Sequence, residues 1–123
     1  MNVIRYRAMS EWQTEAEFRQ NLNTKFRLLA ETKEPIDLTL VDVESRPSEA
    51  HEEAGMERFS VFFKSPLEYL LQQAVYPLSH PQMGQFEVFL VPIGQEADGF
   101  RYEAVYNYYK SAAAEAKTDQ TGD

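Results

Sequence analysis

Two histidines and one glutamate within a strand are the residues of this 123-residue chain that could support acid–base or metal chemistry. His51 lies in the acidic stretch Glu49–Glu53 (EAHEE). A catalytic zinc site normally needs three protein ligands at defined spacing, often two histidines four residues apart on a helix. A single histidine in a stretch with no regular apolar pattern does not meet this requirement. We therefore expect a solvated acidic loop here, and no metal ion.

His80 and Glu103 are the remaining candidates for acid–base chemistry. His80 directly follows Ser79, but neighbouring residues of a strand point to opposite faces, and the chain has no G-x-S-x-G elbow. We expect His80 to pack at the rim of the sheet and to hydrogen-bond a backbone carbonyl or a carboxylate. Glu103 interrupts an apolar strand, so it must be exposed or paired, and we expect an ion pair with Arg101, Arg58 or His80. Contact with a partner is the alternative for Glu103. An acid–base enzyme using His80 and Glu103 is the least favoured hypothesis, so we predict no enzymatic activity.

Several other kinds of site are disfavoured by what the sequence lacks. The chain has no cysteine, which excludes disulfides, thiolate nucleophiles and cysteine-based metal sites. Its five glycines are isolated, so neither the P-loop nor the dinucleotide-binding pattern is present, and we expect no cofactor. Gly84, Gly94 and Gly99 are instead typical of turn residues with positive φ.

The charge balance narrows the class of partner. Twelve basic against twenty acidic side chains give a net charge of −8, which disfavours nucleic acid and anionic membranes. Such acidity serves solubility or recognition of a basic partner. The chain has no secretory signal and no apolar run of about 18 residues, so we expect a cytoplasmic protein.

A β-hairpin is the strongest structural signal. Two aromatic-rich runs, Phe86–Pro92 and Phe100–Tyr109, are separated by Ile93–Gly99. Their length and composition predict paired strands at the centre of a small antiparallel sheet. Apart from Glu87, the run Phe86–Val91 is apolar at every position, so we expect it to be covered on both faces.

The rest of the chain adds further strands and one helix. Alternating apolar residues predict strands over 25–32, 36–43, 58–64 and 74–80. The apolar phase slips by one residue at Val41, which indicates a β-bulge or, as the alternative, a strand covered on both faces, and Pro77 indicates an edge or a bend. Ser10 or Thr14 can cap a helix that ends near Asn21, and residues 67–73 predict one or two helical turns. The predicted fold is therefore α+β and mostly β: about six antiparallel strands in a twisted sheet or small partly open barrel, with one N-terminal helix. We expect one domain over residues 10–109, preceded by an extended arm (1–9) and followed by a flexible acidic tail (110–123), with a long loop over 44–57.

Three motifs in the second half of the chain carry a family resemblance. They are Tyr76–Gly84 (YPLSHPQMG), Phe89–Gly94 (FLVPIG) and Tyr102–Asn107 (YEAVYN). The pattern resembles a family of small bacterial proteins of unknown function with the motifs Y-x-L-x-H-P-x-x-G, F-L-V-P-I-G and Y-E-A-V-F-N, over residues 14–108. The chain departs from it at Ala74, where glycine is frequent, and at Tyr106, where phenylalanine is usual. The resemblance implies a bacterial or phage-associated origin and a β-rich fold, and supplies no catalytic residue.

The favoured hypothesis is a non-enzymatic interaction or assembly module, an accessory component of a bacterial or phage-like particle. It would bind a protein partner or itself, because exposed strand edges and tyrosines favour such contacts. The residues expected at the contact are Tyr76, His80, Tyr102, Glu103, Tyr106 and Asn107. The alternative is a barrel or cleft that binds a small apolar ligand, lined by Phe59, Phe63, Tyr76, Phe89 and Tyr106.

Overall fold

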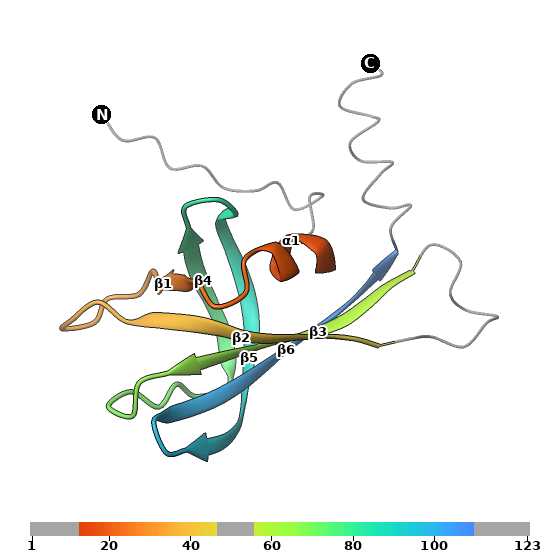
Figure 1. Cartoon of the computed structure of the whole chain (residues 1–123). Coiled ribbons are helices and arrows are strands. Elements are labelled where there is room, and N and C mark those ends of the chain that lie inside the picture. The colour runs from red at the N-terminus through yellow and green to blue at the C-terminus, as the bar shows by residue number, and fades with distance from the viewer. Residues whose placement is uncertain (1–12, 47–55, 110–123) are drawn as a thin grey trace, which may run out of the picture.

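Six antiparallel strands close into a barrel in the computed structural model, which describes residues 13–46 and 56–109 (Figure 1). Around the barrel the strands follow the order β1-β2-β3-β6-β5-β4. The elements are α1 (Glu15–Gln20), β1 (Lys25–Leu28), β2 (Asp37–Ser45), β3 (Met56–Ser65), β4 (Ala74–His80), β5 (Gly84–Glu96) and β6 (Gly99–Tyr109). The predicted fold class, mostly β with one N-terminal helix, is confirmed. The predicted arm and tail, Ser10 and the acidic stretch around His51 lie outside the described residues.

Large apolar side chains fill the inside of the barrel. Phe26, Phe59, Phe63 and Tyr102 are fully buried. Leucines and valines of β1–β5 and Ala104 of β6 pack around them. Along β5 the burial alternates: Phe86, Val88 and Leu90 face the core, whereas Glu87 and Phe89 are exposed. The prediction that both faces of this run are covered is therefore wrong, because no element among residues 13–46 and 56–109 covers its outer face.

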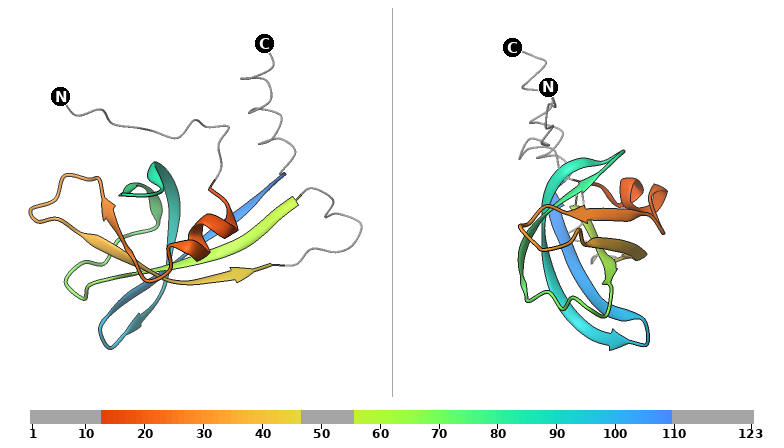
Figure 2. Two further views of the ribbon diagram at one scale, coloured as in Figure 1. Left: turned by 45° about the horizontal axis from the view of Figure 1, so that its top comes forward. Right: turned by 90° about the vertical axis from the view of Figure 1, so that its left-hand side faces the viewer.

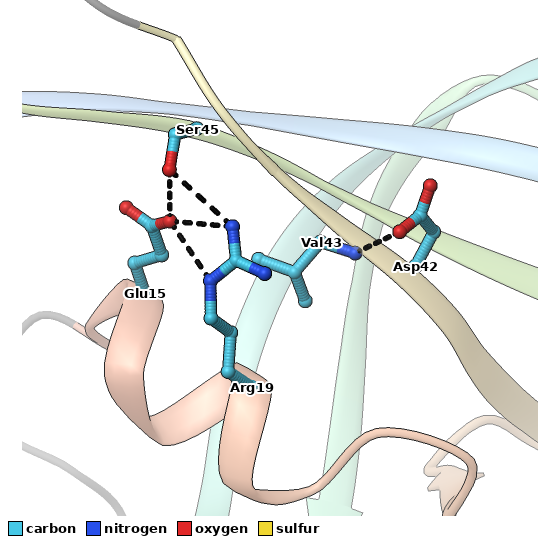
Figure 3. Close-up of polar contacts among 5 residues, drawn as sticks. All are labelled: Glu15, Arg19, Asp42, Val43 and Ser45. Carbon is cyan, nitrogen blue, oxygen red and sulfur yellow. Dashed lines mark hydrogen bonds and ion pairs between the residues drawn. The ribbon is translucent and has the colours of Figure 1, made fainter.

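Helix α1 closes one side of the barrel through a single large side chain. Thr14 caps it, since the Thr14 hydroxyl accepts from the Glu17 amide and the Glu17 carboxylate accepts from the Thr14 amide, each at 3.1 Å. Phe18 is the fully buried residue of this helix. On the exposed side, Glu15 and Arg19 contact each other and Ser45 at the end of β2 (Figure 3). The helix lies against β2 and β3 (Figure 2).

The β5–β6 hairpin has the predicted position and a tighter turn. Pairing runs to Glu96 opposite Gly99, which leaves a two-residue connection. Gly84 has positive φ (79°), as predicted, but Gly94 and Gly99 do not. A Cβ atom on Gly99 would lie 2.1 Å from the Ser65 carbonyl oxygen, so glycine is required there by the close approach of β3.

Two irregularities have identifiable causes. The predicted bulge in β2 is confirmed, as a register shift between Leu40 and Asp42, and the Asp42 carboxylate accepts from the Val43 amide at 2.8 Å (Figure 3). Residues 67–73 form a turn, a stretch without regular secondary structure and a bend, so the predicted helical turns are wrong. The reason is the buried Tyr102 hydroxyl, which accepts from the Leu71 amide at 2.8 Å and lies 2.9 Å from Ser65 Oγ. These contacts hold the segment to the end of the barrel.

Candidate protein-docking groove

Strand β5 changes its neighbour halfway along its length. Residues Gly84–Leu90 pair with β4, whereas the ladder with β6 starts at Val91 opposite Glu103 and runs to the turn. Strand β6 instead continues beside β3 as far as Tyr109. In Figure 1 the strands β4 and β5 rise away from β2, β3 and β6, with α1 between the two groups. The hairpin therefore opens beyond Glu103.

A groove of about 260 Å³ lies where β5 and β6 separate. We call it the β5–β6 groove. Its lining comes from the residue before the helix cap and from the facing parts of the two strands: Gln13, Glu87, Val88, Phe89, Ala104, Val105, Tyr106, Asn107 and Tyr108. Small-molecule sites usually enclose about 300–1,000 Å³ and bury most of the ligand. An open groove below that range fits part of an extended chain better than a cofactor.

The β5 side of the groove is a sheet edge. In an antiparallel strand, successive residues direct their backbone groups alternately to one side and the other. Along Gly84–Leu90 one set faces β4, and the other set faces the groove, where no described strand pairs with it. Such an edge can accept another strand. The same stretch thus offers donors and acceptors to an incoming segment.

Gln13 forms the floor of the groove and is held in place by two tyrosines. The Tyr106 hydroxyl donates to Gln13 Oε1 at 3.0 Å, and the Tyr108 hydroxyl donates to the Gln13 carbonyl at 2.8 Å. The Gln13 side chain is buried. These bonds attach the residue before the helix cap to β6.

Exposed apolar side chains flank the groove on the outer face of the barrel. Phe89 on β5 is 48% exposed and Val105 on β6 is 55% exposed. Val75, directly opposite Phe89 on β4, is also 55% exposed. Exposed apolar side chains grouped on one face are typical of interaction surfaces, whereas single ones are ordinary. Glu87 and Asn107, both exposed, supply polar groups to the same groove.

Glu103 does not form any of the predicted ion pairs. It lies on the outer face and accepts a hydrogen bond from the Ser60 hydroxyl at 2.7 Å, and no ion pair of Glu103 occurs within the described residues. Arg101 instead lies over the Phe62 ring, 5.1 Å from its centre, and its guanidinium is 3.6 Å from Glu96. Arg101, on the same strand as Glu103, therefore contacts Phe62 and Glu96 instead of Glu103.

His80 points into the barrel and closes the β4–β5 turn. Its Nδ1 accepts from the amides of Gln82 (3.1 Å) and Met83 (3.3 Å), and its Nε2 lies 2.8 Å from the Thr24 hydroxyl. Two amide donors on Nδ1 place the ring proton on Nε2. Burial lowers the pKa of His80, because the charged imidazolium would lose its hydration. The predicted carbonyl or carboxylate partner is therefore wrong, and a histidine inside the barrel does not meet Glu103 on the outside.

The other predicted contact residues divide between core and groove. Tyr106 and Asn107 line the groove, whereas Tyr102 is fully buried and Tyr76 is half-buried, with its hydroxyl donating to the Gln72 carbonyl. Sequence reasoning missed Gln13, Glu87 and Val105 as groove residues. The alternation of inward and outward residues along a strand could have indicated Glu87 and Val105, because both, like Phe89, occupy outward-facing positions of their strands.

The five aromatic residues predicted to line a ligand cleft do not surround one space. Phe89 and Tyr106 both line the β5–β6 groove, and Tyr76 does not. Phe59 and Phe63 pack in the core, where the Phe59 ring stacks on that of Tyr106 at 4.8 Å. Within residues 13–46 and 56–109, no three potential metal ligands of the His, Cys, Asp or Glu type come together. In that same part of the chain, no helix has the length and apolarity that crossing a membrane requires.

Comparison with known proteins places the chain in a family but supplies no activity. No curated protein and no solved structure matches it. One family model matches residues 14–106, from the helix cap to the buried Tyr106 of β6. This range contains α1, strands β1–β5 and most of β6, and so covers most of the groove. The chain belongs to the family described as "Domain of unknown function (DUF6916)".

Proposed function

We propose that this protein is a non-enzymatic interaction module that holds an extended segment of a partner protein in the β5–β6 groove. The observation that carries the proposal is the change of neighbour along β5. Over Gly84–Leu90 this strand presents an edge toward the groove without a partner among the described strands, beside the exposed Phe89 and Val105. The backbone edge of β5 and the exposed apolar side chains therefore both lie at the β5–β6 groove.

Strand addition explains how such a groove binds. Backbone hydrogen bonds from the β5 edge supply affinity for any extended chain, and side-chain contacts at alternate positions supply specificity. Phe89 and Val105 provide the apolar contacts, and aromatic residues are frequent among those that dominate binding energy. The filled core beneath, with Gln13 fixed by two tyrosine hydroxyls, keeps the groove open without the partner. Binding then requires little ordering of the barrel itself.

The biological setting is part of the same proposal. A small module that holds one segment of a partner suits an accessory component of a larger assembly. The family resemblance of the three motifs supports a bacterial or phage-like particle as that assembly.

A matched pair of variants tests the proposal. Phe89 and Ile93 lie on the same strand and are 48% and 47% exposed, but Ile93 does not line the groove. Tagged wild-type protein, Phe89→Glu and Ile93→Glu are produced in the native host, and the proteins recovered with each are quantified by mass spectrometry. Wild type and Ile93→Glu should recover the same partner, and Phe89→Glu should lose it. Equal recovery with Phe89→Glu, or no recovery with wild type, would contradict the proposal, provided that circular dichroism shows all three proteins folded.

A further inference from the structure

We infer that the segment held in the β5–β6 groove is basic, with a lysine or arginine two residues from an apolar side chain. This inference rests on the proposed docking function. It follows from the distribution of charge and apolar surface along the groove, and it names the chemistry of the partner.

One carboxylate, that of Glu87, belongs to the described lining of the groove, and two others lie close to it. Glu87 is exposed within it, and Glu103 lies on the outer face where the β5–β6 ladder ends. Beside Tyr108, the Glu57 carboxylate lies 3.4 Å from the Tyr108 hydroxyl oxygen. No lysine or arginine belongs to the described lining, and on the β3 side Arg58 is the ladder partner of Asn107. Glu87 is therefore the one charged residue of the described lining, and it makes the groove acidic.

The net charge of the chain also favours a basic segment in the groove. At −8, the protein attracts basic segments and repels another copy of itself. A second copy of this chain is therefore the less favoured occupant. A basic segment also gains speed of association from this field.

The side chains of β5 define the spacing. Glu87 and Phe89 both point outward, two residues apart, on the edge that an added strand would pair with. Side chains directly opposite each other on neighbouring strands are in contact, and opposite charges or apolar groups there are favourable. An added strand would thus place a basic residue opposite Glu87 and an apolar residue opposite Phe89. These two positions are i and i+2 of the segment, in either direction.

A peptide library tests this inference directly. A randomised library of ten-residue peptides is selected on immobilised wild-type protein, and the enriched peptides are sequenced. We expect enrichment of lysine or arginine two residues from Val, Ile, Leu or Phe. One enriched peptide is then labelled with fluorescein, and its dissociation constant is measured by anisotropy for wild type, Glu87→Gln, Glu68→Gln and Phe89→Glu. Glu68 is an exposed glutamate in the segment between β3 and β4, outside the groove lining, and serves as the control.

The outcomes separate the two proposals. Glu87→Gln should weaken binding about three- to fivefold, as expected for one exposed ion pair, and Glu68→Gln should leave it unchanged. Enrichment without basic residues, or equal affinity for Glu87→Gln and wild type, would overturn the basic segment while the docking function stands. If no peptide is enriched, or if the peptide binds Phe89→Glu as tightly as wild type, the docking function itself is contradicted.

Discussion

The substitution Phe18→Ala tests how α1 is held on the barrel. Phe18 is fully buried and is the only residue of this described helix to be so. Its ring centre lies 5.4 to 6.5 Å from those of five other rings: Phe26, Phe59, Phe63, Phe86 and Tyr106. Removing a buried phenylalanine ring costs about 3–5 kcal/mol, since transfer energy is lost and a cavity is left. Against a total stability of about 5–15 kcal/mol, this is a large fraction.

Urea unfolding followed by circular dichroism measures the effect. We expect the free energy of unfolding to fall by at least about 3 kcal/mol in Phe18→Ala, and by less in Phe18→Leu, which keeps most of the apolar volume. Phe18→Leu also keeps the test informative if the alanine variant does not fold. Arg19→Ala on the exposed side is the control, and should cost no more than about 1 kcal/mol, because its ion pair with Glu15 is exposed. A loss below about 1 kcal/mol in Phe18→Ala would refute the idea that this ring anchors the helix.

Three further predictions concern single groups in the barrel. Tyr102→Phe should lower the free energy of urea unfolding by about 1–3 kcal/mol, because it leaves the part-buried Leu71 amide without its acceptor. Tyr76→Phe, whose acceptor carbonyl is exposed, should cost less than about 1 kcal/mol, and equal losses would contradict this. Since burial lowers the pKa of His80 below 6.5, the unfolded chain binds the proton first as the pH falls. Stability should therefore be full above pH 6.5 and decrease below it, and unfolding at a series of pH values should show a smaller decrease in His80→Gln. Gly99→Ala should lower the melting temperature, because the added Cβ clashes with β3 at a cost of about 1–3 kcal/mol. Gly94→Ala is the control: nothing lies within 4 Å of its Cβ position, so the free energy of unfolding should change by less than about 0.5 kcal/mol. An unchanged melting temperature in Gly99→Ala would show that β3 can move away.

Those features of the fold that depend only on residues close together in the sequence could be predicted. The alternation in Phe100–Tyr109 depends only on the period of a strand, and the phase slip after Leu40 indicates a bulge. Thr14 with Glu17 forms a capping box within four residues. The segment 67–73 could not be predicted, because its apolar residues suit a helix. The group that holds it in a non-helical form, the Tyr102 hydroxyl, comes from a strand about thirty residues later.

The candidate site was harder to predict than the fold. Apolar residues on both faces of β5 suggested a covered strand, and nothing local shows that β5 exchanges β4 for β6 at Val91. Polar atoms also misled the choice of contact residues. His80 and Tyr102 bond to groups inside the barrel, whereas the exposed positions next to the groove, Phe89 and Val105, are apolar. Burial of a polar group depends on whether the fold supplies a partner, which is a property of the tertiary structure.

Amide hydrogen exchange resolved by residue, measured with and without an enriched basic peptide, tests the central claim most directly. In the free protein, amides along Gly84–Leu90 should alternate between slow exchange, where they face β4, and fast exchange, where they face the groove. Addition of the peptide should slow the fast set and leave the β3–β6 ladder unchanged. Uniformly slow exchange along this stretch of the free protein, or protection by the peptide at another part of the barrel, would contradict an open β5 edge as the docking site.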